Sequence, residues 1–256
     1  MIDMPAAAVY YCCLQGGAAI VYPWIFSAGV LLSIAWLMLQ DASRESTETV
    51  QDLLPAAAWS LGLGLLLARL CFVGAYAAYY FEHPVEILWL WQGGLNGAGG
   101  AVGAVLGAGI YALVSDLPLR AILDRLAIPG LIVAIGCWMG CWLDGCAYGI
   151  PVRASLPLFN TYDMFATRSS RWPAALIGLI PLLGGLALLN FTTACRMPSG
   201  RLAAISFTAV ALSILRASLA RADPVPIVFH MRADTLAGLA LSIAGASAFL
   251  ISFQKG

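Results

Sequence analysis

One arginine interrupts one of the most apolar stretches of the chain. Arg69 lies inside LGLGLLLARLCFVGAYAAYY, residues 61–80. A charged side chain in the middle of a membrane span costs roughly 2.5–3.5 kcal/mol even on the lenient insertion scale, so it is expected to face a polar cavity. A guanidinium also offers planar, bidentate donors that match phosphate oxygens. Arg69 is therefore a candidate catalytic phosphate clamp; the alternative is an arginine paired for structural reasons.

Three further arginines lie close to the ends of apolar runs. Arg216 and Arg221 occur in SILRASLARADP, and Arg171 lies two residues before the apolar run that starts at Pro173. We predict Arg216 as a second catalytic cation and Arg171 and Arg221 as ligands of a lipid headgroup. In this interpretation Arg69, Arg171 and Arg216 converge on one lipid-accessible cavity, whereas paired surface charges are the alternative.

The densest group of reactive side chains is GCWMGCWLDGCAYG, residues 136–149. Its three cysteines are spaced by four and five residues, which does not fit the paired spacing of a structural zinc site. The chain has 2 histidines, both distant in sequence, and a catalytic thiol needs a histidine or cation beside it. We therefore predict no metal and buried packing for Cys137, Cys141 and Cys146, and lipid binding for Asp144 and Tyr148.

The glycine-rich segment GGLNGAGGAVGAVLGAG, residues 93–109, has no predicted strand before it, which argues against a dinucleotide loop. Three of its glycines recur every four residues and therefore share one helix face, where small residues allow close helix packing. They are Gly99, Gly103 and Gly107. Asn96, at the start of the segment, is predicted either to bind a lipid headgroup or to cap the helix.

The elements that position these residues follow from composition. Of 256 residues, 61% are hydrophobic and 10% are charged, whereas a soluble domain has roughly 45–50% and 25%. A span takes roughly 20 apolar residues, so the chain is predicted to be an all-α polytopic membrane protein, with residues 1–256 forming a single membrane domain. Seven spans are predicted, at Gly17–Leu39, Pro55–Phe81, Leu95–Val114, Leu126–Tyr148, Pro173–Phe191, Leu202–Leu219 and Thr235–Phe253.

The connections and the charge complete this picture. Ser115–Arg125 alternates charged and apolar residues and is predicted to lie along the membrane surface. Gly149–Trp172, the longest linker, is a candidate lid or mouth of the site. The 13 basic and 13 acidic residues give a formal net charge of zero, so no nucleic-acid partner is expected.

Several segments together resemble the prolipoprotein diacylglyceryl transferase family. ARLCFVGAYAAYYFEHPVEILWLWQGGL is similar to its second span and the segment after it, LRAILDRLAIPGLIVAIGCWMGCWLDGCAYG resembles the family signature, and RWP and PSG resemble the starts of later spans. The resemblance implies a seven-span enzyme of the bacterial inner membrane with no cofactor. Such an enzyme moves diacylglycerol from phosphatidylglycerol to the lipobox cysteine of a prolipoprotein and releases glycerol phosphate.

The sequence departs from the family pattern where catalysis is expected. Trp138 stands in place of the signature arginine, Ala98 in place of a histidine, Trp172 in place of another histidine, and Asp144 in place of the usual asparagine. Two hypotheses remain open: a diacylglyceryl transferase, and a degenerate relative that binds phospholipid as a subunit or scaffold of a membrane complex. Under the first hypothesis the partners are phosphatidylglycerol and the prolipoprotein signal peptide.

Overall fold

The computed structural model describes residues 21–42, 50–90, 93–153, 160–162, 168–193 and 198–254. Residues 17–20 of the first predicted span lie outside these ranges, as does much of the predicted lid between Gly149 and Trp172. The described residues are predominantly helical, and seven of their helices are long and apolar enough to cross a membrane. The predictions of an all-α fold and of seven spans are confirmed.

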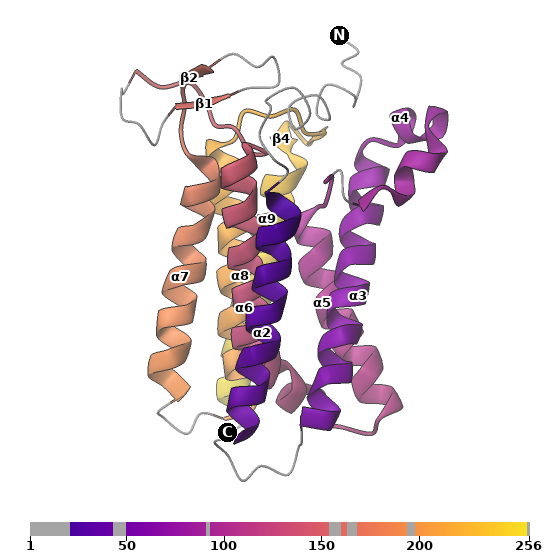
Figure 1. Cartoon of the computed structure of the whole chain (residues 1–256). Helices are drawn as coiled ribbons and strands as arrows, with labels where there is room; N and C mark the ends of the chain where they lie inside the picture. Colours follow the sequence, from indigo (N-terminus) through magenta and orange to yellow (C-terminus); the bar gives the residue numbers. More distant parts are fainter. Residues whose placement is uncertain are drawn as a thin grey trace.

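The long helices alternate in direction, so that the first of them begins at one end of the bundle and the last of them ends at the other (Figure 1). They are α2 (Tyr22–Ala42), α3 (Val50–Ala75), α5 (Gly97–Val114), α6 (Leu119–Asp144), α7 (Ala174–Thr193), α8 (Arg201–Ala220) and α9 (Ala233–Gln254). A short helix, α4 (Ala77–Glu82), and a 3-10 turn, η1 (Pro84–Leu88), follow α3. Two small antiparallel hairpins pair β1 (Asn160–Tyr162) with β2 (Arg168–Ser170) and β3 (Ile227–Val228) with β4 (Met231–Arg232).

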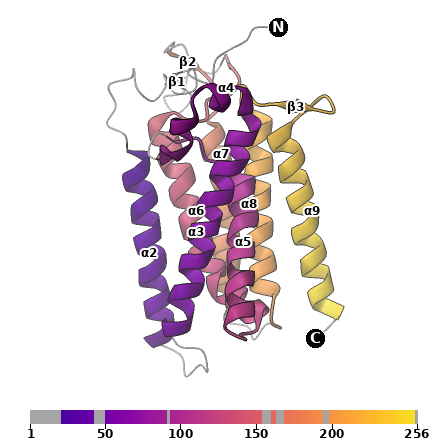
Figure 2. The same ribbon diagram turned by 90° about the vertical axis from the view of Figure 1, so that its right-hand side faces the viewer.

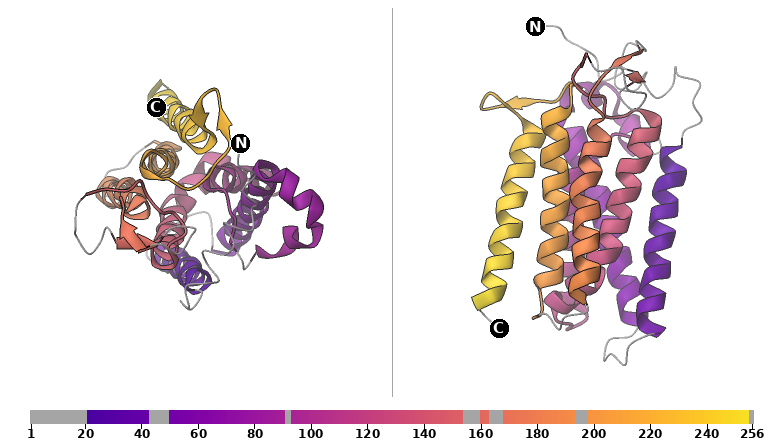
Figure 3. Two further views of the ribbon diagram at one scale, coloured as in Figure 1. Left: turned by 90° about the horizontal axis from the view of Figure 1, so that it is seen from above. Right: turned by 90° about the vertical axis from the view of Figure 1, so that its left-hand side faces the viewer.

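The helices form two groups. Helix α3 packs most closely on α5, whereas α2 packs on α6, and α6, α7, α8 and α9 form a continuous series of contacts. Figure 2 shows α3 and α5 side by side along their lengths. The view from above in Figure 3 places this pair on one side of the molecule and α7 on the opposite side.

Glycines make the close approach of α3 and α5 possible. Gly99, Gly103 and Gly107 are all buried on one face of α5. A Cβ atom at Gly103 would overlap the carbonyl oxygen of Leu63, and one at Gly107 would overlap that of Trp59. The predicted role of the four-residue glycine repeat in helix packing is confirmed.

The main core lies between α6, α7 and α8, where Ile128, Leu131, Leu182 and Leu189 are buried against one another. On the outer surface large apolar side chains are exposed, among them Leu113 at 81% and Phe191 at 77%. Exposed apolar side chains over this many helices are expected where lipid, not water, is the surrounding solvent.

Two predicted boundaries were wrong. The second span ends at Ala75 and not at Phe81, because Tyr76 leaves the helical conformation before α4 begins. The segment Ser115–Arg125 does not lie separately on the surface, since α6 begins at Leu119. The Asp124 carboxylate in this first part of α6 accepts hydrogen bonds from the backbone N–H groups of Gly200 (2.6 Å) and Ala203 (2.8 Å), at the start of α8.

Candidate functional site

A cavity of about 1860 Å³ lies between the α3–α5 pair and helices α2, α6, α8 and α9. Pockets for ordinary small molecules have volumes of roughly 300–1,000 Å³, so this cavity is large enough for a bulkier ligand. Its lining runs from Tyr22 and Asp144 at the end of the bundle that carries the hairpins to Arg120 and Ser252 at the opposite end. Most of the lining between these ends is apolar.

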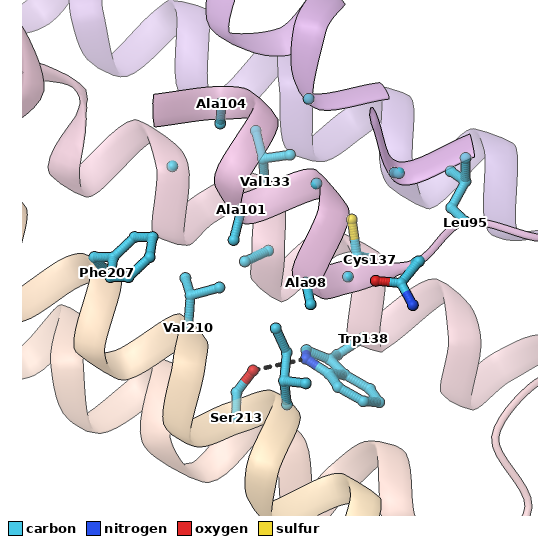
Figure 4. Close-up of a pocket in the computed structure, with 18 of the residues that line it drawn as sticks. Leu95, Ala98, Ala101, Ala104, Val133, Cys137, Trp138, Phe207, Val210 and Ser213 are labelled. Carbon is cyan, nitrogen blue, oxygen red and sulfur yellow. Dashed lines mark hydrogen bonds between the residues drawn. The ribbon is translucent and has the colours of Figure 1, made fainter. Parts of the chain in front are cut away.

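The cavity wall carries Ala98 and Trp138, two of the four departures from the expected catalytic pattern. Figure 4 shows Ala98 and Trp138 among apolar neighbours that include Val210. The indole of Trp138 donates a hydrogen bond to the hydroxyl of Ser213 at 3.0 Å. Gly178 makes room for this indole, because a Cβ atom there would lie 2.8 Å from Cε2 of Trp138. Neither Ala98 nor Trp138 brings a charge to this part of the wall.

Four of the five charged residues that line the cavity lie at the hairpin end; the exception is Arg120. Arg221 forms a bidentate ion pair with Asp223. Arg232 bridges the side chains of Asp223 (3.5 Å) and Asp234 (3.1 Å) and also donates to the backbone carbonyl of Asp223. Three of these residues, Arg221, Asp223 and Asp234, line the cavity. This four-residue network joins the end of α8 to the start of α9.

The charges of this network shift the pKa values of Arg221 and of the neighbouring Tyr76. Burial works against the charge of Arg221, but the Asp223 carboxylate outweighs it, so the pKa of Arg221 is raised above its ordinary value. Tyr76, which donates a hydrogen bond to the Pro224 carbonyl at 2.8 Å, has a raised pKa because of burial and, second, the nearby Asp223 carboxylate. Arg221 therefore stays charged and Tyr76 neutral over the whole physiological pH range.

Asp144 and Asn96, two of the predicted lipid ligands, line the cavity at this end and also stabilise the helix ends near them. Asp144 accepts hydrogen bonds from the backbone N–H groups of Val21 (3.0 Å) and Tyr22 (2.8 Å), and thus anchors the start of α2. Asn96 caps α5 by accepting a bond from the N–H of Gly99 at 2.9 Å. Helix capping was one of the two roles that we expected for Asn96.

Arg69 is buried, at 3% exposure. Its guanidinium donates to the backbone carbonyls of Glu86 (2.5 Å), Ile87 (2.8 Å), Gly93 (2.8 Å) and Gly94 (3.1 Å). The geometry favours the structural alternative for this residue, because these four bonds tie η1 and the following turn to α3. Gly94 lines the cavity and Arg69 lies behind it.

The predicted convergence of Arg69, Arg171 and Arg216 on the cavity is wrong, since none of the three lines it. Arg171 lies over the ring of Tyr148, 5.3 Å from its centroid, and donates to the carbonyl of Gly149. Arg216 is exposed on α8. Of the predicted residues, Arg221, Asp144, Asn96 and Tyr148 do share the cavity.

The sequence analysis missed Asp223, Arg232 and Asp234 as parts of one network. A signal was available, because the tripeptide Arg-Ala-Asp occurs twice, at residues 221–223 and 232–234. The two copies flank the β3–β4 hairpin, which folds them against each other. Among the described residues there is no group of three or more His, Cys, Asp or Glu side chains arranged to hold a metal ion.

Comparison with known proteins identifies the scaffold. A family model described as prolipoprotein diacylglyceryl transferase matches residues 14–251. The chain belongs to the prolipoprotein diacylglyceryl transferase family. This confirms the resemblance seen in the sequence and establishes a multi-pass membrane protein of a bacterial family.

Individual members of the prolipoprotein diacylglyceryl transferase family are similar over most of the chain. A phosphatidylglycerol–prolipoprotein diacylglyceryl transferase of Bacillus licheniformis is 27% identical over 244 residues, covering 91% of this chain and 87% of the relative. Proteins of the same name from Lactococcus lactis and Limosilactobacillus reuteri are each 32% identical, over 182 and 197 residues. The matches cover 68% and 72% of this chain, and 67% and 69% of those relatives.

Proposed function

We propose that the chain transfers diacylglycerol from phosphatidylglycerol to the lipobox cysteine of a prolipoprotein, in the bacterial inner membrane. The observation that carries this proposal is the cavity, whose long apolar interior ends at the charged Arg221. A phospholipid has the same division into long apolar chains and an anionic headgroup. The match of residues 14–251 to the prolipoprotein diacylglyceryl transferase family supports a transfer of diacylglycerol.

In this proposal the acyl chains occupy the apolar middle of the cavity and the phosphate lies near Arg221. The lipobox thiolate attacks the glycerol carbon that carries the phosphate ester, since the thiolate and not the thiol is the nucleophile. The carbon–oxygen bond to the phosphate breaks, and glycerol phosphate leaves with the electron pair. Arg221, which remains charged, stabilises the negative charge of the leaving phosphate.

The test is whether the chain restores lipoprotein lipidation in bacteria depleted of their own transferase. We expect restoration by the natural chain and its loss with Arg221→Gln. Arg153→Gln is the matched control, because Arg153 is exposed and does not line the cavity. An absence of lipidation at normal membrane levels of the natural chain would contradict the proposal.

One specific observation favours a second function. Ala98 and Trp138 line the cavity without bringing a charge or a base, and Trp138 is held there by a hydrogen bond to Ser213. A relative without those groups would bind phospholipid as a subunit or scaffold of a membrane complex and would not transfer it. Loss of a phosphate-clamping cation and a base is expected to cost several kcal/mol of transition-state stabilisation.

The two functions are separated by measuring lipid binding and transfer on the same purified protein. Binding is measured with phosphatidylglycerol and with phosphatidylcholine of the same acyl chains, and transfer with a lipobox peptide. A transferase consumes phosphatidylglycerol and releases glycerol phosphate. A binding subunit retains phosphatidylglycerol unchanged, and co-purification from native membranes then identifies the complex to which it belongs.

A further inference from the structure

Helix α6 ends in a left-handed turn that brings two cysteines together. Gly145 has a φ of 70° and its N–H donates to the carbonyl of Cys141. The N–H of Cys146 donates to the same carbonyl at 3.0 Å. In this type of helix ending, the residue four positions before the left-handed residue characteristically packs against the residue directly after it. Here those two residues are Cys141 and Cys146.

The side chains lie near each other, as the backbone predicts. The thiols of Cys141 and Cys146 are within interaction range. Both residues line the cavity, and Cys146 is exposed while Cys141 is half-buried. The expectation of buried packing for these cysteines is therefore wrong for Cys146. One thiol can be reached by a reagent in the cavity and the second lies directly behind it.

Charged residues of both signs lie near the pair. Arg221, Asp144 and Asp223 are all close enough to Cys141 to act on it electrostatically. Cys137, one turn earlier, also lines the cavity but lies within interaction range of the hydroxyl of Tyr22. Thiol–disulfide exchange within one chain requires two thiols close together and access for one of them, and this pair meets both requirements.

We propose that Cys141 and Cys146 are a redox-active dithiol that a disulfide donor converts into an intramolecular disulfide. The Cys146 thiolate attacks one sulfur of the donor disulfide, forming a mixed disulfide and releasing the first donor thiolate. The Cys141 thiol loses its proton to solvent and attacks the sulfur of Cys146, releasing the second donor thiolate. The pair loses two electrons and two protons, and the donor is reduced to two thiols.

The position of this pair gives the disulfide a structural effect. Asp144 lies between the two cysteines in sequence, and its carboxylate holds the first turn of α2. A bond from residue 141 to residue 146 closes a small ring around Asp144 and fixes the last turn of α6. The link between α6 and α2 at the charged end of the cavity is thereby fixed in one geometry.

The first experiment treats the full-length purified protein with oxidised glutathione, alkylates the remaining thiols and maps the products by mass spectrometry. We expect loss of alkylation at residues 141 and 146 together, with a peptide that carries the bond between them. Cys137→Ser is expected to leave this product unchanged. A bond between Cys137 and Cys141, or full alkylation of both Cys141 and Cys146 after oxidation, would overturn the proposal.

The second experiment needs no oxidation. Phenylarsine oxide binds two adjacent thiols at once, and the second bond is intramolecular, so Cys146→Ser is expected to weaken binding about 100-fold. Cys71→Ser is the matched control, since Cys71 is also exposed but belongs to α3. Equal affinity of the natural chain and Cys146→Ser would show that the two thiols do not act as a pair. Thermal unfolding of each variant confirms that the comparison is made on folded protein.

Discussion

The carboxylate of Asp144, at the end of α6, accepts a hydrogen bond of 2.8 Å from the backbone N–H of Tyr22, at the start of α2. Its other oxygen accepts from Val21 at 3.0 Å. The first N–H groups of a helix have no partner within the helix, so an acidic side chain supplied from another helix is a stabilising cap. This single residue joins two spans that are far apart in sequence.

Asp144→Ala is expected to lower the free energy of unfolding by about 1–2 kcal/mol, because two backbone donors lose their acceptor. Asp144→Asn is expected to cost about half as much, since one amide oxygen remains as an acceptor. Thermal unfolding in detergent measures both values. Equal stability of the natural protein and the alanine variant would show that the cap contributes nothing.

Gly107→Ala is expected to destabilise the α3–α5 contact by roughly 1–3 kcal/mol, because its methyl group overlaps the Trp59 carbonyl and the backbones must separate. The control is Gly109→Ala in the same helix, where nothing lies within 4 Å of the new methyl group. That change is expected to be neutral or to stabilise by about 0.5–1 kcal/mol through helix propensity. Unfolding measurements that rank the two variants in the opposite order would contradict the packing described.

Trp138→Phe removes the donor that satisfies the hydroxyl of Ser213, a residue at 1% exposure. The expected loss of stability is roughly 1–3 kcal/mol. Trp142→Phe is the matched control, because Trp142 also lines the cavity but makes no hydrogen bond with another described residue. If both variants unfold at the same temperature, the Trp138–Ser213 bond is not a stabilising contact.

The raised pKa of Tyr76 predicts a loss of stability at alkaline pH. The unfolded chain ionises this tyrosine near the ordinary pKa of 10.0, whereas burial, aided by Asp223, keeps it neutral in the folded protein. The unfolded state therefore binds fewer protons above that pH, and stability falls as pH rises from about 10 towards the folded pKa. Tyr76→Phe is expected to make the stability less dependent on pH in this range. The same change removes the hydrogen bond to Pro224 and so lowers the stability at all pH values. Parallel stability curves for the two proteins between pH 9 and 11 would contradict it.

Arg69→Ala leaves four backbone carbonyls without their charged donor and is expected to destabilise the protein by roughly 3 kcal/mol or more. Arg69→Lys is expected to recover only part of this loss, because an ammonium group cannot reproduce the planar fork of a guanidinium. Unfolding and phosphatidylglycerol binding are measured together. If Arg69→Ala weakens lipid binding but leaves the stability unchanged, Arg69 is a phosphate ligand and not a structural residue.

The number and order of the spans could be predicted because each run of apolar residues is long enough to cross the membrane unaided. The predicted ends of the helices were wrong where a contact with a residue distant in sequence overrides the local conformational preference. The charged residues after Pro118 suggested a segment on the membrane surface. In the structure Asp124 lies within α6, where its carboxylate caps the start of α8. The break at Tyr76 likewise coincides with a long-range bond to Pro224.

The candidate site was predicted only in part, because the direction in which a side chain points depends on the packing of several helices. Arg221 faces the cavity, whereas Arg216, little more than one helical turn earlier, does not. The burial of Arg69 depends on Gly93 and Gly94, whose left-handed backbone turns their carbonyls towards it. No local pattern around Arg69 reveals this arrangement.

The glycine seam between α3 and α5 also has a mechanical consequence. Helices α3 and α5 are in backbone contact at Gly103 and Gly107, so neither can rotate about its own axis without a steric clash. The two helices therefore move as one rigid body. For a lipid to enter the cavity from this side, both helices must move together, with the turns that join them to their neighbours acting as hinges. The rate of lipid exchange would then depend on those turns more than on the side chains that the lipid meets.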